Sequence, residues 1–183
     1  MSPESPAEES PSEHAVTRIL MLPDLEATHA LAGQLAPHLA PGLRIGLRGG
    51  LGAGKTTFVR ALLSALGHRG RVRSPTFTLH EPYQVGERTI HHFDLYRFAD
   101  PAEWVDAGFD ELLNGPALSL IEWPEQAQGV LPPTDIDLLL EPMNPDGPPA
   151  LARANDAPET APRRVRLTAQ TDKGQACLRD AGL

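Results

Sequence analysis

The sequence predicts a single α/β domain with three layers, in which a mixed β-sheet lies between two sets of helices. A glycine-rich loop at residues 49–56 joins an apolar run to a helical pattern, as in a strand–loop–helix unit. Short β-prone runs alternate with helical patterns, which is typical of a sheet with parallel strands. Two of these runs flank a glycine turn at residues 85–87 and predict an antiparallel pair, so the sheet is expected to be mixed.

The first half of the chain is predicted to form four elements, and the glycine-rich loop joins the last two. Pro23-Asp24 is a suitable helix start, and Pro41-Gly42 is a suitable helix stop. The expected elements are a strand at 17–22, a helix at 25–39, a strand at 43–47 and a helix from the loop to about residue 66.

The second half is predicted to complete the sheet. The expected elements are hairpin strands at 76–81 and 89–94, short helical pieces within 101–114, a buried strand at 117–121, strands at 136–140 and 164–169, and a helix from about residue 173. The strands at 136–140 and 164–169 are expected to pair with each other across the segment between them.

One domain is expected, spanning residues 15–141 and ending with the final strand and helix at 163–183. Residues 1–14 contain four Glu, four Ser and three Pro, and are expected to form a disordered acidic tail because they cannot bury enough apolar surface. Residues 142–162 contain six Pro and little periodicity, and are expected to be an insertion or linker.

The charge is unevenly distributed along the chain. The net charge is −8, yet residues 44–73 contain seven basic residues and no acidic one. This stretch is expected to attract an anionic ligand. A nucleic-acid platform is the alternative, which the acidic balance and the absence of interleaved basic and aromatic residues make weaker.

Cysteine usage and the lack of long apolar segments indicate the cellular compartment. Cys177 is the only cysteine, so no disulfide can form within the chain. The N-terminus has no apolar signal segment, and no run of 18 apolar residues occurs. We therefore expect a cytoplasmic protein with no membrane partner.

The glycine-rich loop fits the pattern GxxxxGK[ST] and predicts a P-loop NTPase domain. Its glycines let backbone N–H groups approach phosphate oxygens, while Lys55 is suited to the β- and γ-phosphates and Thr56 to Mg²⁺. No NKxD-type stretch for guanine is present, so ATP is the expected nucleotide. The predicted nucleotide-binding residues in this stretch are Gly49, Gly50, Leu51, Gly52, Ala53, Gly54, Lys55, Thr56 and Thr57.

Phosphoryl transfer also needs a carboxylate near the metal or the attacking water. Two predicted strands end in an acid, and Glu122 follows the more apolar run, so it is the first candidate for the Mg²⁺ ligand, with Asp94 the second. Thr76 lies where a loop could sense the γ-phosphate, or it caps a strand entry. Trp123 either covers the site or fills the core.

A zinc site is not expected. His91 and His92 are adjacent strand residues that point to opposite faces, and no third ligand lies at a suitable spacing.

Four motifs together resemble the TsaE family, once called YjeE. They are GxLGAGKTT at 49–57, LGxxGxVxSPTFTL at 66–79, HFDLYR at 92–97 and IEWPEQ at 121–126. The resemblance covers about residues 16–141 and resumes near residue 165.

The resemblance implies a P-loop ATPase that binds ATP with Mg²⁺ and supports threonylcarbamoyl modification of adenosine 37 in tRNA. It implies partners of the TsaD and TsaB type, an indirect relation to tRNA, and hydrolysis that is weak without the partners. Lys55 and Thr56 match the phosphate and magnesium positions, Glu122 matches a second magnesium position, and Asp94 and Trp123 match residues associated with activity. The family usually has an acid where this chain has Gly50.

Two other functions remain open. A small-molecule kinase would need an arginine-bearing lid, which the sequence does not offer. A nucleotide-dependent binding module would need ATP occupancy but not turnover. Arg97 is the nearest candidate for an arginine finger, although an arginine beside a strand is more often part of a salt bridge.

Overall fold

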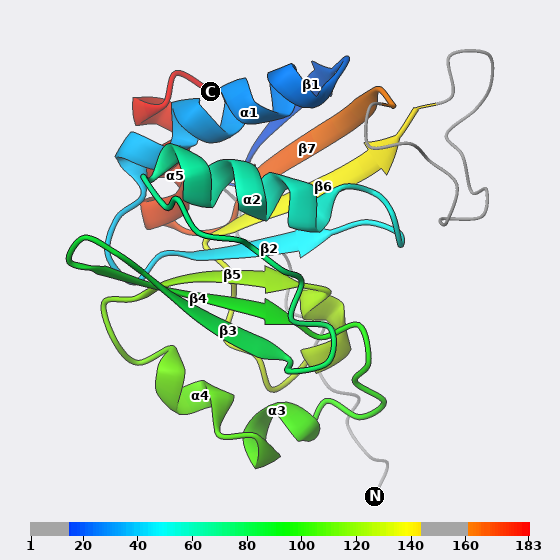
Figure 1. Cartoon of the computed structure of the whole chain (residues 1–183), viewed down its shortest axis with the longest axis vertical. Helices are drawn as coiled ribbons and strands as arrows, with labels where there is room; N and C mark the ends of the chain where they lie inside the picture. Colours follow the sequence, from blue (N-terminus) through cyan, green and yellow to red (C-terminus); the bar gives the residue numbers. More distant parts are fainter. Residues whose placement is uncertain (1–14, 144–160) are drawn as a thin grey trace, which may run out of the picture.

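The computed structural model describes residues 15–143 and 161–183, which form one seven-stranded sheet with helices on both faces (Figure 1). The predictions for residues 1–14, and for all but the ends of segment 142–162, lie outside the described residues. The strands are β1 (Val16–Leu22), β2 (Arg44–Arg48), β3 (His80–Val85), β4 (Arg88–Asp94), β5 (Leu118–Glu122), β6 (Ile136–Pro142) and β7 (Arg163–Ala169). The α-helices are α1 (Leu25–Leu35), α2 (Lys55–Ala65), α3 (Glu103–Asp106), α4 (Phe109–Leu112) and α5 (Asp172–Asp180), and the 3₁₀ helices are η1 (Ala36–His38) and η2 (Pro124–Ala127).

The sheet has the strand order β1-β7-β6-β2-β5-β4-β3 and is mixed, as predicted. Strand β2 runs parallel to β5 and β6, and β4 runs parallel to β5. The pairs β1–β7, β6–β7 and β3–β4 are antiparallel. The carboxyl ends of β2, β4, β5 and β6 therefore meet at one edge of the sheet, where ligands bind in open α/β folds.

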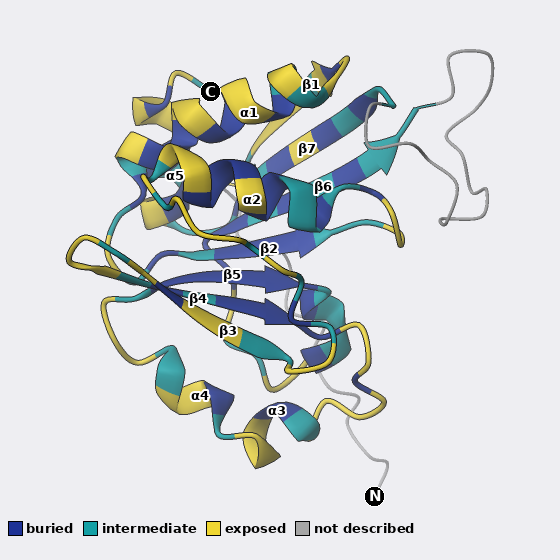
Figure 2. Cartoon of the chain, viewed as in Figure 1, coloured by how far each residue is buried: buried dark blue, intermediate teal, exposed yellow. Residues whose placement is uncertain are grey.

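The three predicted layers are present. Helices α1, α2 and α5 lie on one face of the sheet, over a core that includes Leu35, Phe58, Leu62 and Leu178 (Figures 1 and 2). Helices α3, α4 and η2 cover the other face beneath β4 and β5, where Trp104 packs in a smaller aromatic cluster. The central strands are buried on both faces, as Figure 2 shows, which explains their continuous apolar runs.

The first helix is shorter than predicted. The Asp24 side chain accepts a hydrogen bond from the Ala27 N–H at 2.8 Å and so caps the start of α1. The α-helix ends at Leu35 rather than residue 39, and the chain continues as η1. Pro37 explains the difference, because proline has no N–H to donate and its ring collides with the preceding turn.

The hairpin is also shifted from its predicted position. The expected strand at 76–81 is wrong in its first four residues, because residues 76–79 form a turn and a bend, and β3 begins at His80. The Leu79 N–H donates to the Pro75 carbonyl at 2.6 Å, which closes this turn. Gly86, with φ of 59°, lies in the two-residue connection to β4.

The pairing of β6 with β7 agrees with the sequence-based prediction. Within the described part of the chain, no helix is both long and apolar enough to cross a membrane.

Candidate nucleotide-binding site

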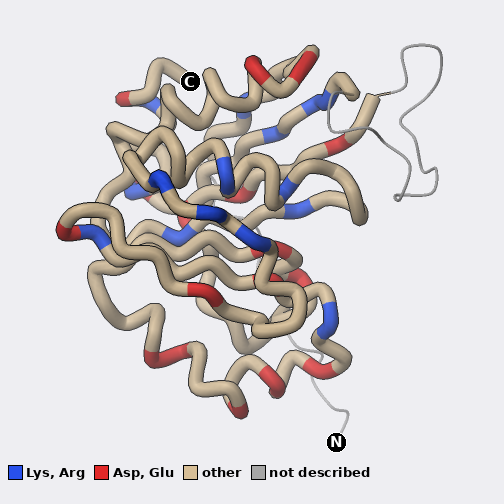
Figure 3. The backbone as a smooth tube through the Cα atoms, in the orientation of Figure 1, with Lys and Arg blue, Asp and Glu red and all other residues tan. Residues whose placement is uncertain are grey.

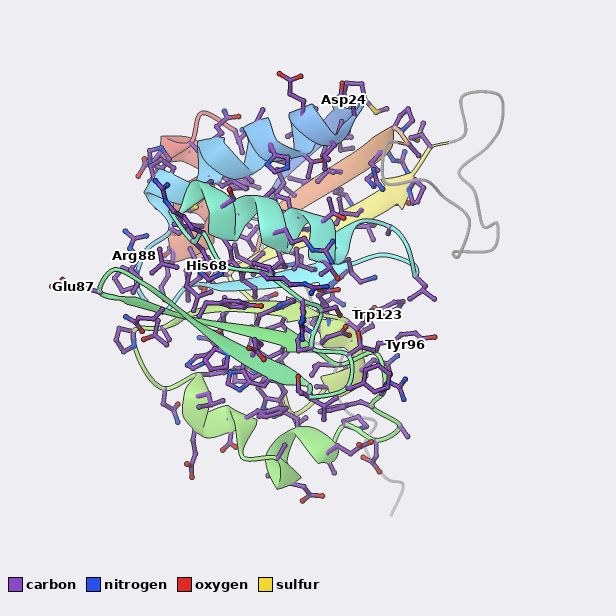
Figure 4. The ribbon with its side chains drawn as sticks, viewed as in Figure 1. Asp24, His68, Glu87, Arg88, Tyr96 and Trp123 are labelled. Atoms are coloured by element: carbon purple, nitrogen blue, oxygen red, sulfur yellow. The ribbon has the colours of Figure 1, made fainter. Side chains whose placement is uncertain are left out.

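A pocket of about 310 Å³ opens at the edge where the parallel strands end. Figure 4 shows Tyr96 and Trp123 near each other at this edge, to which the arrowheads of β4 and β5 point. Ten of the sequence-predicted site residues line the pocket: Leu51, Gly52, Gly54, Lys55, Thr56, Thr57, Thr76, Asp94, Glu122 and Trp123. Gly49, Gly50 and Ala53 belong to the same loop without lining the pocket. Arg60, Ser74, Tyr96 and Arg163 line it but were not predicted.

The loop between β2 and α2 has a conformation that requires glycine. Gly49 has φ of 129° and Gly54 has φ of 104°, a region that side chains disfavour. A Cβ on Gly49 would also collide with the Leu140 carbonyl, and one on Gly54 would press against Arg163. Because Gly54 directly precedes α2, the amino end of that helix faces the pocket and suits an anionic ligand such as a phosphate.

Lys55 is folded back over the loop. Its Nζ donates to the carbonyl oxygens of Gly49 and Gly50 at 2.7 and 2.9 Å, and lies 3.8 Å from the centroid of the Trp123 ring. Burial lowers the pKa of the ammonium, and the carboxylates of Glu122, Asp94 and Glu125 act in the opposite direction. The Lys55 ammonium is thus held by two carbonyl oxygens and by the face of the Trp123 ring.

The structure brings Thr56 and Glu122 into direct contact. The Thr56 hydroxyl is 2.8 and 3.1 Å from the two carboxylate oxygens of Glu122. These residues come from α2 and from the end of β5, and Glu122 is only 3% exposed. A hydroxyl and a carboxylate are hard oxygen ligands of the kind that Mg²⁺ prefers, so the pair fits the metal expected from the sequence.

His92 contacts the same carboxylate from β4. Its Nε2 lies 2.8 Å from Glu122 Oε1, and the side chain is fully buried. Its Nδ1 is buried without a hydrogen-bond partner among the described residues. A proton on Nδ1 would leave a buried donor unpaired, so the proton belongs on Nε2, where it is donated to Glu122. The prediction considered His92 only as a metal ligand and missed this role, although strand alternation places it on the same face as Asp94.

Asp94 anchors the segment that precedes β3. Its Oδ2 accepts hydrogen bonds from the hydroxyls of Ser74 and Thr76 at 2.6 and 2.7 Å, and its Oδ1 accepts one from the Tyr96 N–H at 3.1 Å. Thr76 therefore both forms part of the turn before β3 and lines the pocket. Asp94 is paired in register with Glu122 across β4 and β5, which explains why the two carboxylates share one edge.

Trp123 lines the pocket and also packs against the smaller aromatic cluster on the other face of the sheet. It is half-buried, and its ring centroid lies 5.2 Å from that of Tyr96. Its backbone is left-handed, with φ of 60° and ψ of 47°, a conformation that costs energy for a large side chain. The Trp123 N–H donates to the Leu47 carbonyl at 3.1 Å, so the strained residue is held by the strand that leads into the loop.

Arg97 and Arg163 differ in their position relative to the pocket. Arg97 does not line the pocket, and its guanidinium lies 4.2 Å from the centroid of the Phe77 ring. Arg163, at the start of β7, does line it and donates from Nε to the Ala53 carbonyl at 2.8 Å. Arg163 could not be predicted from a local pattern, because the pairing of β7 with β6 brings it to the loop.

No cluster of three or more metal-binding side chains of the His, Cys, Asp or Glu type occurs among the residues that the structure describes. His91 is in contact with His80, where Nδ1 and Nε2 are 2.9 Å apart.

Comparison with known proteins agrees with the resemblance. Residues 22–146 match the family model described as "Threonylcarbamoyl adenosine biosynthesis protein TsaE". A Haemophilus influenzae protein named "tRNA threonylcarbamoyladenosine biosynthesis protein TsaE" is 51% identical over 85 residues, which are 46% of this chain and 54% of the relative. Proteins of the same name from Rickettsia felis and Bacillus subtilis are 42% and 36% identical over 67% and 63% of this chain, each over 72% of the relative. The chain thus spans about half to three quarters of these relatives.

A solved structure has the same fold. The crystal structure of Bacillus subtilis YdiB aligns with a TM-score of 0.72 and 24% identity, over 93% of this chain and 97% of that one.

Proposed function

The chain belongs to the TsaE family, and we propose that it is a Mg²⁺-dependent ATPase that supports threonylcarbamoyl modification of adenosine 37 in tRNA. It acts as one component of a multi-protein complex, with partners of the TsaD and TsaB type, and its relation to tRNA through that complex is indirect. ATP is the proposed nucleotide because the chain has no NKxD-type stretch. The curated relatives carry names that refer to this modification.

The contact between Thr56 and Glu122 is the observation that carries the proposal. A glycine-rich loop alone binds phosphates, but a buried carboxylate on its Ser/Thr hydroxyl is what metal-assisted hydrolysis requires. The bound Mg²⁺ would neutralise charge on the phosphates. Thr56 and Glu122 would hold it, the amino end of α2 would bind phosphate oxygens, and Glu122 would also orient the attacking water.

Slow turnover by the isolated chain is part of the proposal. Lys55 is bonded to the loop carbonyls and must leave them to reach a phosphate, and Arg97 is stacked on Phe77. Thr56, Glu122 and the amino end of α2 can bind the nucleotide and its metal in the ground state. A cation that stabilises the transition state would come from a partner. The second candidate is a nucleotide-dependent binding module that does not need turnover. The hydrogen bonds of Lys55 to the loop carbonyls are as consistent with this module as with a slow ATPase.

Two variants separate these candidates. Lys55→Ala should weaken ATP affinity at least about tenfold, because it removes a charge-assisted phosphate contact of about 1.5–3 kcal/mol. Glu122→Gln should keep ATP binding and lose turnover. Both would be assayed by calorimetry with Mg²⁺-ATP and by tRNA modification with the purified partner proteins. Equal loss of modification in both variants supports the ATPase, and modification retained in Glu122→Gln supports the binding module.

The partner dependence has its own test. Steady-state phosphate release should be well below about 1 per second for the chain alone and should rise when the partner complex is added. An unchanged rate with partners, or a fast rate alone, would contradict the proposed activation. Unchanged ATP affinity in Lys55→Ala would contradict the nucleotide site itself.

A further inference from the structure

The segment that joins α2 to β3 carries a row of arginines on its outer side. Arg69, Arg71 and Arg73 are all exposed, and Figure 3 shows basic positions in a row along this loop. From residue 71 the alternate side chains point inward, because Val72 packs against the core and Ser74 bonds to Asp94. In this extended part of the segment, Arg71 and Arg73 lie about 6.6 Å from each other on one side, and Arg69 lies beyond the bend at Gly70.

The row borders a second pocket of about 490 Å³, between this segment and the outer surfaces of α1 and α2. The pocket lining includes His29, His68 and Arg69 and contains no acidic residue. None of the three arginines of the row forms an ion pair with a carboxylate of the described chain. The positive charge of this surface is therefore not neutralised by this part of the molecule, although the whole chain is acidic.

An exposed aromatic ring lies at the end of the row. Phe77, four residues beyond Arg73, is 83% exposed, and its ring faces the Arg97 guanidinium at 4.2 Å. The intervening residues limit its distance from Arg73 to about 14 Å. A phenylalanine this exposed gains free energy from a partner that covers its ring, and a nucleobase, which stacks on aromatic side chains, is such a partner.

We propose that the arginine row of residues 69–73, together with Phe77, binds single-stranded RNA. The arginines contact successive phosphates, and a base stacks on Phe77 beside Arg97. A protein partner could also cover the ring, but a single nucleic-acid strand offers phosphates at a regular spacing together with a flat base, so the combination of an arginine row and an exposed ring favours a nucleic acid. The choice of RNA over DNA rests on the proposed role in tRNA modification. The phosphate and base contacts do not rest on that proposed role. They would give the chain a direct contact with RNA, whereas the proposed function relates it to tRNA only through its partners.

The test measures anisotropy of a short fluorescein-labelled single-stranded RNA titrated with the full chain at several salt concentrations. The triple variant Arg69→Gln/Arg71→Gln/Arg73→Gln should weaken binding at least tenfold at about 50 mM salt, and should reduce the slope of log affinity against log salt by about two. Phe77→Ala should weaken binding roughly fivefold to a hundredfold without changing that slope.

A matched control changes the charge equally at other exposed positions. Arg18→Gln/Arg88→Gln/Arg179→Gln alters β1, the hairpin tip and α5, and should bind RNA within about threefold of the unaltered chain. Thermal melting checks that each variant folds. ATP affinity should be unchanged in the arginine-row variant, so a failure here is distinguishable from a failure of the proposed ATPase.

Three outcomes would overturn the proposal. The first is no RNA binding at low salt, and the second is equal weakening in the row variant and the control. The third is an acidic peptide that binds as tightly as the RNA and competes with it. Equal affinity for a DNA strand of the same sequence, with the same dependence on the row, would overturn the choice of RNA.

Discussion

At the scale of single residues, Glu122 is the best-supported group of the candidate site because three elements converge on it. It ends β5, it contacts Thr56 at the start of α2, and it contacts His92 on β4. Burial removes water from a carboxylate, and hydrogen-bond donors compensate for the lost hydration. His92 and Thr56 supply such donors, so His92 acts as a positioning residue for Glu122.

Replacement of His92 tests this positioning role. His92→Leu removes a hydrogen bond to a charged group, worth about 1.5–3 kcal/mol, and should lower kcat for ATP roughly tenfold to a hundredfold. The KM for ATP should change much less, because His92 does not line the pocket. His92→Gln, which can still donate near the Nε2 position, should recover part of the lost kcat. Phosphate release with the partner complex gives the comparison, and a kcat equal to that of the unaltered chain in His92→Leu would contradict the role.

Residue types in a motif could be predicted from the sequence, whereas residues brought together by strand pairing could not. Lys55 and Thr56 follow from one continuous pattern, and Glu122 from its place after an apolar run. Arg163 is separated from the loop that it contacts by more than a hundred residues. No local pattern marks such a residue, because the register of β7 decides where its side chain lies.

At the scale of elements, the hairpin β3–β4 shows where local propensity fails. Residues 76–79 have strand-prone side chains, yet the hydroxyls of Ser74 and Thr76 bond to Asp94 and the chain turns there. Such side-chain hydrogen bonds compete with the strand ladder. The first strand of the hairpin therefore begins four residues later than predicted. Strand β4 accepts these bonds only at its last residue, Asp94, and begins within one residue of its predicted position.

The same hairpin makes stability depend on pH. Burial lowers the pKa of His80 to about 4, with further contributions from His91 and His92, and burial lowers the pKa of His91. In the unfolded chain a histidine titrates near about 6.5. Between these values the unfolded state binds more protons than the folded state, so stability is complete above about pH 6.5 and falls as the pH falls toward 4.

This pH dependence is measurable by thermal melting. The melting temperature should fall between pH 7.5 and pH 5.5 in the unaltered chain and should fall less in His80→Phe. Phenylalanine keeps the stacking on Phe93, where the ring centroids are 4.8 Å apart, but has no titrating group. An equal fall in both proteins would show that other groups cause the pH dependence.

At the scale of the whole molecule, the topology explains how one pocket collects residues from distant parts of the chain. Strand β2 lies at the centre, with β5 on one side and β6 on the other, so the loop after β2 is flanked by the ends of both neighbours. The sequence predicted the mixed sheet and the β6–β7 pair. The position of β1 beside β7, at the far edge of the sheet, was not predicted, because the backbone hydrogen bonds that pair two strands can form between almost any residue types.

The pairing of β6 with β7 predicts that residues 144–160 are dispensable for folding. The Met143 N–H donates to the Pro162 carbonyl at 2.8 Å, so the backbone is already closed at the ends of the two strands. Replacing 144–160 by three Gly or Asn residues shortens the connection and lowers its closure cost by about 1 kcal/mol. The melting temperature should therefore stay the same or rise by about 2–4 °C.

ATP affinity of the shortened chain is the sharper measurement, because β7 carries Arg163 to the loop carbonyl of Ala53. A connection too short to preserve the pairing would slip the register by one residue and turn Arg163 to the opposite face of the sheet. Affinity within about twofold of the full chain, together with an unchanged melting temperature, would show that the pairing alone positions Arg163. The matched variant Arg163→Gln in the full chain calibrates the loss expected from a misplaced arginine. A second variant replaces 144–160 by a flexible segment of the same length. If both this variant and the shortened chain melt more than about 5 °C lower than the full chain, then the natural residues of 144–160 stabilise the fold through contacts of their own.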